Sequence, residues 1–142
     1  MNAVRIVVDT NVWVSALRSR RGASFRSLSL VGTERFAIAL STPLVLEYED
    51  AAKRQLDQLA VTAEEIDRLL DFLCAHGTHQ SVFFLWRPVL PDPADDFVPE
   101  LAVASGAEFI VTYNRRDFAG AERFGLRIVT AKELLQILGE IP

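Results

Sequence analysis

The stretch Val4-Arg5-Ile6-Val7-Val8-Asp9-Thr10-Asn11 lies near the start of the chain and sets the expected fold. Its run of β-branched residues has almost no polar alternation, which predicts a strand buried on both faces. The run ends at Asp9, and the Thr-Asn pair that follows is typical of a helix start. A carboxylate at the carboxyl end of a buried strand occupies the edge at which open α/β sheets bind their ligands. A single acid there is also a common helix cap, so its interpretation depends on whether other acids reach the same edge.

The composition of the 142-residue chain predicts a single domain over residues 1–142, because half of the residues are hydrophobic. The longest apolar run, residues 82–86, is too short to cross a bilayer, and the N-terminus leaves no room for a signal peptide before the first strand. The lone Cys74 excludes an internal disulfide, so we expect a cytoplasmic protein. The net charge of −4 argues against a passive electrostatic binder of nucleic acid, but not against an enzyme whose acids are neutralised by a metal.

Apolar patterning and helix caps predict that strands alternate with helices along the chain. Strands are expected at residues 6–8, 36–40, 81–85, 109–111 and 126–129, and helices at 12–17, 24–31, 42–59, 62–77, 95–105 and 130–138. Two capping boxes mark helix starts, Thr62 with Glu65 and Thr130 with Glu133. This alternation is typical of a three-layer α/β/α sandwich with a mostly parallel five-stranded sheet. Right-handed crossovers then leave the carboxyl end of every strand on one edge.

Carboxylate or amide side chains follow each of the first four predicted strands. In chain order they are Asp9; Glu47, about one turn into the next helix; Asp92, Asp95 and Asp96; and Asn114 with Asp117. Several carboxylates brought together are electrostatically costly unless a cation or proton shares the site. Oxygen ligands without His or Cys point to a hard cation, Mg²⁺ or Mn²⁺ rather than Zn²⁺. The sequence therefore predicts a divalent metal site suited to phosphate chemistry.

Five short motifs follow one another along nearly the whole chain. They are V-V-D-T-N-V at 7–12, S-T-P-L-V-L-E-Y at 41–48, P-D-P-A-D-D at 91–96, the segment 102–106, and I-V-T-Y-N at 110–114. As a set, in this order and spacing, they resemble the PIN domain family, and in particular the bacterial VapC-like toxins of toxin–antitoxin systems. The resemblance implies a metal-dependent ribonuclease with a PIN-like sheet of order 3-2-1-4-5 and a cluster of three or four acids.

The resemblance also implies roles for individual residues. By position, Asp9, Glu47 and Asp96 match the three acids that bind the metal and carry catalysis. Asn114 stands at the fourth acidic position, where many PIN domains have Asp, and Asp117 follows three residues later. Either of these two would complete the metal site, so the number of metal ions, one or two, stays open at this point.

Polar and basic side chains near the same edge are candidates for binding RNA. They are Thr10, Asn11, Thr112, Arg115 and Arg116, with a second basic cluster at residues 18–26. A solvated surface is the usual explanation for such basic runs. The Thr112 hydroxyl could bond a metal-bound carboxylate, the scissile phosphate or only the local backbone.

The sequence thus predicts an endoribonuclease that hydrolyses RNA phosphodiester bonds with Mg²⁺ or Mn²⁺, and the resemblance implies a homodimer neutralised by a small antitoxin protein. Two alternatives stay open. Asn114 at the fourth acidic position favours a catalytically weak or inactive PIN-like module that acts through protein or RNA binding. A receiver-type domain needs a phosphoacceptor Asp at the end of a central strand, but the nearest candidate, Asp50, falls within the predicted helix that begins at Thr42.

Overall fold

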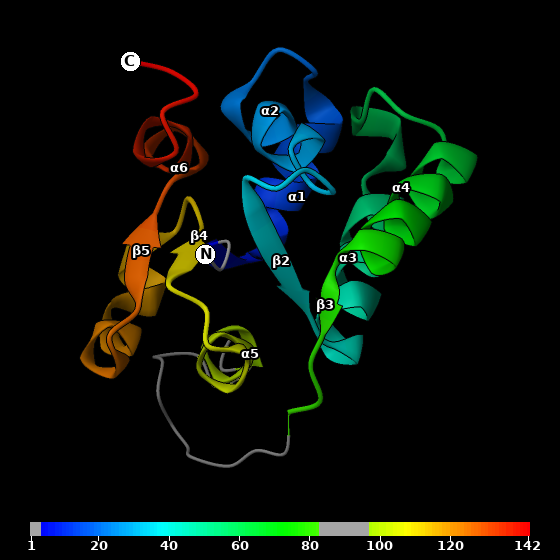
Figure 1. Ribbon diagram of the computed structural model, residues 1–142. Helices are drawn as coiled ribbons and strands as arrows, with labels where there is room; N and C mark the ends of the chain where they lie inside the picture. Colours follow the sequence, from blue (N-terminus) through cyan, green and yellow to red (C-terminus); the bar gives the residue numbers. More distant parts are fainter. Residues whose placement is uncertain (1–3, 83–96) are drawn as a thin grey trace.

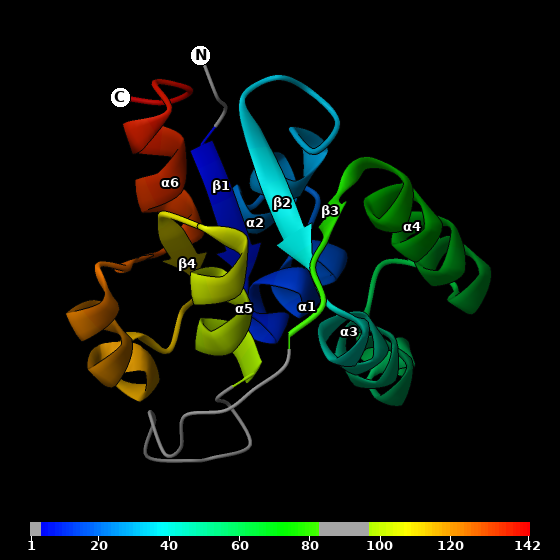
Figure 2. The same ribbon diagram turned by 60° about the horizontal axis from the view of Figure 1, so that its bottom comes forward.

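The computed structural model describes residues 4–82 and 97–142, and its centre is a parallel five-stranded sheet (Figures 1 and 2). The strand order is β3-β2-β1-β4-β5, which confirms the predicted α/β fold and the order 3-2-1-4-5. The strands are β1 (Val4–Val8), β2 (Phe36–Leu40), β3 (Thr78–His79), β4 (Phe109–Val111) and β5 (Arg127–Val129). The helices are α1 (Thr10–Arg18), α2 (Ala23–Ser29), α3 (Thr42–Arg54), α4 (Ala63–His76), α5 (Phe97–Ser105) and α6 (Ala131–Ile137), with 3₁₀ segments η1 (Leu56–Gln58) and η3 (Arg115–Phe124).

Helices cover both faces of the sheet. Helix α5 packs against β1, β2 and β4 on one face, and α1, α2 and α6 lie on the opposite face (Figure 1). Helices α3 and α4 pack against each other near the β2–β3 edge (Figure 2). Ile6 and Val7 of β1 are fully buried, as the β-branched run predicts for a strand covered on both faces. No helix within the described ranges is long and apolar enough to cross a membrane.

Both predicted capping boxes are present. Thr62 and Glu65 exchange hydrogen bonds at the start of α4, and Thr130 and Glu133 do the same at the start of α6. The hydrogen bond from the cap backbone is the main cause that lowers the pKa of each glutamate. Pro99 lies in the first turn of α5, where a missing amide proton costs no hydrogen bond. These local signals therefore fix helix starts reliably.

The third strand differs from its prediction. The apolar run predicts it at residues 81–85, but β3 is the short segment Thr78–His79, paired in parallel with the end of β2. Gly77 ends α4 beside Leu40 of β2, so the chain joins the sheet at once, and the Gln80 amide donates to the Leu40 carbonyl. An edge strand needs no continuous apolar run, which is why the hydropathy pattern missed it. Residues 83–85 and the predicted helix start at 95–96 lie outside the described residues.

Two other segments also depart from the predicted helices. The helix expected up to residue 59 ends at Arg54, and the 3₁₀ turn η1 follows it. The segment η3 has no counterpart among the predicted helices, because its ten residues carry few apolar side chains and only Phe118 and Ala121 are buried. Neither difference moves the predicted acids, since Glu47 precedes the end of α3 and Asp117 lies in the first turn of η3.

Gly77 generates a stability prediction. A Cβ atom added there would lie 2.6 Å from Leu40 Cδ1 and 2.8 Å from the Leu73 carbonyl oxygen, although φ of −81° and ψ of 163° suit any residue. We expect Gly77→Ala to lower the free energy of unfolding by about 1–3 kcal/mol through overpacking. Gly22→Ala is the matched control, because Gly22 has φ of −81°, ψ of 165° and its nearest atom at 3.9 Å. Urea unfolding measures both variants, and equal losses would contradict the steric explanation.

Candidate active site

Asp9 lies directly after β1 and accepts hydrogen bonds from two sides. Its Oδ1 accepts from the Thr10 amide at 2.9 Å, as the cap of α1, and its Oδ2 accepts from the Thr112 hydroxyl at 2.8 Å. The Asp9 amide donates to the Val111 carbonyl at 2.9 Å, which continues the pairing of β1 with β4. Asp9 is therefore a helix cap, and the same hydrogen bonds fix its carboxylate at the edge of the sheet.

Thr112 connects the polar residues around Asp9. It is fully buried, and its hydroxyl donates to Asp9 while it accepts from the Asn114 amide at 3.0 Å and from Asn11 Nδ2 at 3.4 Å. Of the three contacts that the sequence allows for this hydroxyl, the structure shows two, one with a carboxylate and one with the local backbone. Thr112 therefore orients Asp9, and any effect on substrate acts through that acid.

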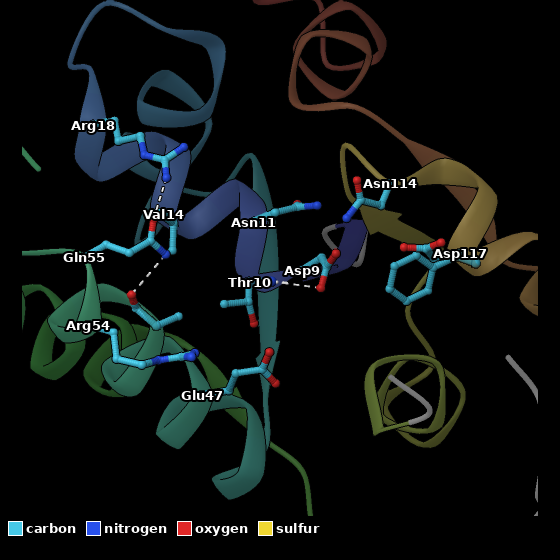
Figure 3. A pocket seen from close by; sticks show the side chains of 12 residues that line it. Asp9, Thr10, Asn11, Val14, Arg18, Glu47, Arg54, Gln55, Asn114 and Asp117 are labelled. Carbon is cyan, nitrogen blue, oxygen red and sulfur yellow. Dashed lines mark hydrogen bonds between the residues drawn. The ribbon is translucent and has the colours of Figure 1, made fainter. Parts of the chain in front are cut away.

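A cavity of about 340 Å³ opens at this edge of the sheet (Figure 3). The predicted metal-site residues that line it come from three parts of the chain: Asp9 after β1, Glu47 on α3, and Asn114 with Asp117 after β4. Figure 3 shows Glu47 reaching from α3 toward the end of β1, with Asn114 and Asp117 on the other side of Asp9. The structure thus brings together four of the five predicted metal-site residues, and the fifth, Asp96, lies outside the described residues.

Tyr48 anchors α3 against the end of β1. Its hydroxyl donates to the Val8 carbonyl, its own carbonyl accepts from Trp13 Nε1 at 2.9 Å, and the Trp13 and Tyr48 rings stack with centroids 5.4 Å apart. Burial, and then the charges of Asp9 and Glu47, raise the pKa of Tyr48 well above its ordinary value. The phenol therefore stays protonated as a donor. Both carboxylates act on the same buried hydroxyl, which agrees with their meeting in one cavity.

Of the two arginines of the cavity, Arg18 is among the candidates expected for RNA, and Arg54 is not. Arg18, within the second basic cluster, lines it and donates to Gln55, and Arg54 lines it from α3. Sequence reasoning missed Arg54, although it follows Glu47 by seven residues, two helical turns along the same face. Arg54 also pairs with Asp50 at 3.0 Å. Asp50 is therefore an exposed helix residue, and the receiver-type alternative has no phosphoacceptor at that position.

The other predicted substrate residues lie around the cavity rather than all within it. Thr10 and Asn11 line it, and the Thr10 hydroxyl is buried with no hydrogen-bond partner in the part of the chain that the structure describes. Arg115 and Arg116 do not line it. Arg115 pairs with Glu133 of the α6 cap, and Arg116 is exposed beside it in η3. Their roles toward RNA stay predictions.

Glu100 is a buried acid that sequence analysis did not single out. It lies in α5 with only 3% of its surface exposed. It follows Asp96 by four residues, so the spacing of one helical turn could have drawn attention to it. Helix α5 packs against β1 and β4, the strands that end at Asp9 and Thr112. Glu100 therefore adds a carboxylate to the helix that covers this part of the sheet.

The donors of the cavity fit a hard divalent cation. Asp9, Glu47, Asp117 and Asn114 offer oxygen atoms, and no Cys or His is among the described residues that line it. Residues 4–82 and 97–142 contain no group of three or more acids, His or Cys able to hold a metal ion by themselves. Mg²⁺ commonly keeps several waters and uses only one or two carboxylates together with substrate phosphates. The described residues are therefore a suitable part of such a ligand shell.

A family model described as PIN domain matches residues 5–116. The chain belongs to the PIN domain family. PIN domains are typically metal-dependent nucleases. The matched range contains three of the predicted metal-site residues that line the cavity, Asp9, Glu47 and Asn114, and Asp117 follows it directly. A search of curated proteins found no match to the chain.

Tyr48 generates a prediction about pH and stability. In the folded protein the pKa of Tyr48 lies above the ordinary 10.0, so the protonated phenol makes its full contribution to the stability of the fold below pH 10. That contribution is lost as the pH rises above 10, because the unfolded chain then ionises first. We expect Tyr48→Phe to remove this component, and to cost about 1 kcal/mol at neutral pH because the Val8 carbonyl loses a donor. Urea unfolding of both proteins from pH 8 to 11, in EDTA, measures the difference. Parallel curves would contradict the assignment.

Proposed function

We propose that this PIN domain is an endoribonuclease that hydrolyses RNA phosphodiester bonds with Mg²⁺ or Mn²⁺. The observation that carries the proposal is the meeting of Asp9 and Glu47 with Asn114 and Asp117 in one cavity of a nuclease-family fold. These side chains come from separate elements, and their shared negative charge is costly without a cation. Their chemistry and their family therefore support the same activity.

In this proposal Asp9, Glu47 and Asp96 hold the ion, and Asn114 or Asp117 completes the shell. When bound, such an ion offsets charge on the phosphate and activates a water for attack on phosphorus. Thr112 keeps the Asp9 carboxylate aimed into the cavity, and the Tyr48 anchor keeps α3, and with it Glu47, beside the end of β1. An amide in the fourth position binds a cation more weakly than a carboxylate, which favours one well-held metal over two.

Local positive charge offsets the net charge of −4 where RNA would approach. Arg18 and Arg54 line the cavity, and guanidinium groups match phosphate oxygens with two parallel hydrogen bonds. Arg115 and Arg116 begin η3 outside the cavity lining and would contact phosphates beyond the cavity. Salt would therefore weaken RNA binding even though the whole protein is acidic.

Asp9→Asn tests the mechanism. Mutation of a group that only supports a metal ligand typically lowers metal affinity or activity by about 10- to 100-fold. We therefore expect the loss of a metal-binding acid to reduce the rate of cleavage by at least about 100-fold. Folding should be kept, since Asn caps a helix as well as Asp does. The assay follows cleavage of a fluorescent RNA in Mn²⁺, with circular dichroism as the folding control. Asp57→Asn, an exposed acid of η1 away from the cavity, should retain full activity. Full activity in Asp9→Asn would remove Asp9 from the mechanism.

Metal removal provides an independent test. We expect dialysis against EDTA to abolish cleavage, because the cavity acids supply no Lewis acid of their own, and added Mg²⁺ or Mn²⁺ to restore it. A buffer exchange without EDTA is the control. Cleavage that persists at saturating chelator would contradict the metal-dependent reaction.

We also propose, on the resemblance to VapC-like toxins, that the protein acts in the cytoplasm as the toxin of a toxin–antitoxin pair, as a homodimer neutralised by a small antitoxin. Induced expression should then arrest growth, and Asp9→Asn should not. Co-expression of the neighbouring reading frame should restore growth, and light scattering of the purified protein gives its oligomeric state. Normal growth with the intact protein would contradict the toxin role but would leave the proposed ribonuclease activity untouched.

A second candidate is a catalytically weak or inactive PIN-like module that binds RNA or protein. Two observations favour it: the amide of Asn114 in the cavity, and the lack of a three-acid metal group within residues 4–82 and 97–142. Such a module would bind RNA equally well with and without the Asp9→Asn substitution, and it would cleave none of several RNAs in Mg²⁺ or Mn²⁺. The cleavage assay described above separates the two candidates.

A further inference from the structure

Tyr113 is an exposed aromatic residue that lies between two residues of the site in the chain, Thr112 and Asn114. It follows Thr112 after β4, and 44% of its surface is exposed. Its amide donates to Asn11 Oδ1 at 3.4 Å. Hydrogen bonds also fix the residues on either side of it in the chain: the Thr112 hydroxyl donates to Asp9, and the Asn114 amide donates to the Thr112 hydroxyl. The backbone of Tyr113 is therefore fixed at the rim of the cavity.

The far end of the Tyr113 side chain is also held. Its hydroxyl lies 2.5 Å from Ser24 Oγ, and Ser24 is buried near the start of α2. An aromatic ring held at its backbone and at its hydroxyl loses little rotamer freedom when a ligand stacks on it. Tyrosine is suited to such contacts, because it offers a large rigid face at low entropic cost.

The surroundings of Tyr113 distinguish it from two other exposed aromatic residues, Phe25 and Phe72. Phe25 and Phe72 border an apolar hollow between α1, α2 and α4, where they have apolar neighbours. Tyr113 instead adjoins polar groups: Asn11 and Asn114 of the cavity. A hydrogen bond to Ser24 alone would explain a tyrosine there, but it needs only the hydroxyl and leaves the exposed ring unexplained.

The ligand that fits this arrangement is a nucleotide with an unpaired base. A phosphate bound in the cavity would place an attached nucleoside at its rim, where the Tyr113 amide contacts Asn11 and the chain continues into Asn114. Arg116, exposed three residues further on and without an ion pair to any residue of the described ranges, can contact a neighbouring phosphate. Proteins that bind single strands combine aromatic platforms with basic side chains in this way.

We infer that Tyr113 is a base-stacking platform that holds one unpaired base of the RNA next to the phosphate in the cavity. The inference rests on the proposed function for the identity of the ligand. A base within a duplex has both faces covered by its neighbours, so this platform selects an unpaired nucleotide at the position of cleavage. Ser24 is the positioning residue that fixes the ring.

Binding to short oligonucleotides in EDTA tests the platform without cleavage. The probes are a fluorescent twelve-residue oligouridylate and the same chain with abasic residues, which keeps the phosphates and removes the bases. We expect Tyr113→Ala to weaken oligouridylate binding by about 5- to 100-fold, the effect of one lost stack, and to leave abasic binding unchanged. Tyr113→Phe keeps the ring and should stay within about three-fold of the intact protein.

Controls make the result specific. Phe72→Ala removes an aromatic residue of similar exposure, 41%, on α4, and it should not change either affinity. A 2-aminopurine base in the oligonucleotide should lose fluorescence on binding through stacking, and this loss should disappear in Tyr113→Ala but not in Phe72→Ala. Circular dichroism confirms that each variant is folded.

The outcomes separate this inference from the proposed function. Equal oligouridylate binding by the intact protein and Tyr113→Ala, or an equal loss with the abasic probe, would overturn the platform. RNA cleavage by the intact protein in that case would leave the nuclease intact. Tyr113-dependent binding and quenching without any cleavage would support the platform and overturn the nuclease. No binding of either probe by the intact protein would overturn the platform as well.

Discussion

The hydrogen bond from the Thr112 hydroxyl to the Asp9 carboxylate is the contact on which the rest of the site depends. It joins the ends of β1 and β4, two neighbouring parallel strands whose residues lie about a hundred positions apart in the chain. The same hydroxyl receives hydrogen bonds from Asn11 and Asn114, so all its capacity is used. A buried hydroxyl with its donor and acceptor sites filled cannot rotate freely, and this holds the acid in one orientation.

The opposite wall of the cavity is held by aromatic packing rather than by a polar network. The Tyr48 and Trp13 rings stack, and each side chain donates a hydrogen bond to a backbone carbonyl, which ties α3 and α1 to the end of β1. Glu47 precedes Tyr48 in sequence and projects into the cavity, while Tyr48 points into the core. Adjacent residues of a helix face different directions, so one buried anchor, Tyr48, can fix the place of one half-buried acid, Glu47.

The proposed binding of RNA by an acidic protein requires that positive charge be organised locally. The cavity gathers the carboxylates of Asp9, Glu47 and Asp117 together with the guanidinium groups of Arg18 and Arg54, within a chain of net charge −4. At physiological ionic strength charges further away than about 8 Å are largely screened, so the local arrangement outweighs the total. The exposed ring of Tyr113 adds an uncharged contact at the same rim, which salt does not screen.

The amino-acid sequence by itself determined the α/β fold, the strand order implied by the family resemblance, the helix caps and the edge at which the acids gather. Apart from the strand order, which only the family resemblance implied, those features follow from patterns within a few residues: the β-branched run before Asp9, and Thr62 and Thr130 with a glutamate three positions later. Only the tertiary structure decided which side chains reach the cavity. Arg54 enters it while Arg115 pairs with Glu133, and the Thr112 hydroxyl bonds Asp9 as well as the local backbone. The edge strand β3 and the contact between Tyr113 and Ser24 were likewise settled by packing. The physical reason is that such contacts depend on the register of strands and on the rotation of helices brought together from distant parts of the chain, and no local pattern records either.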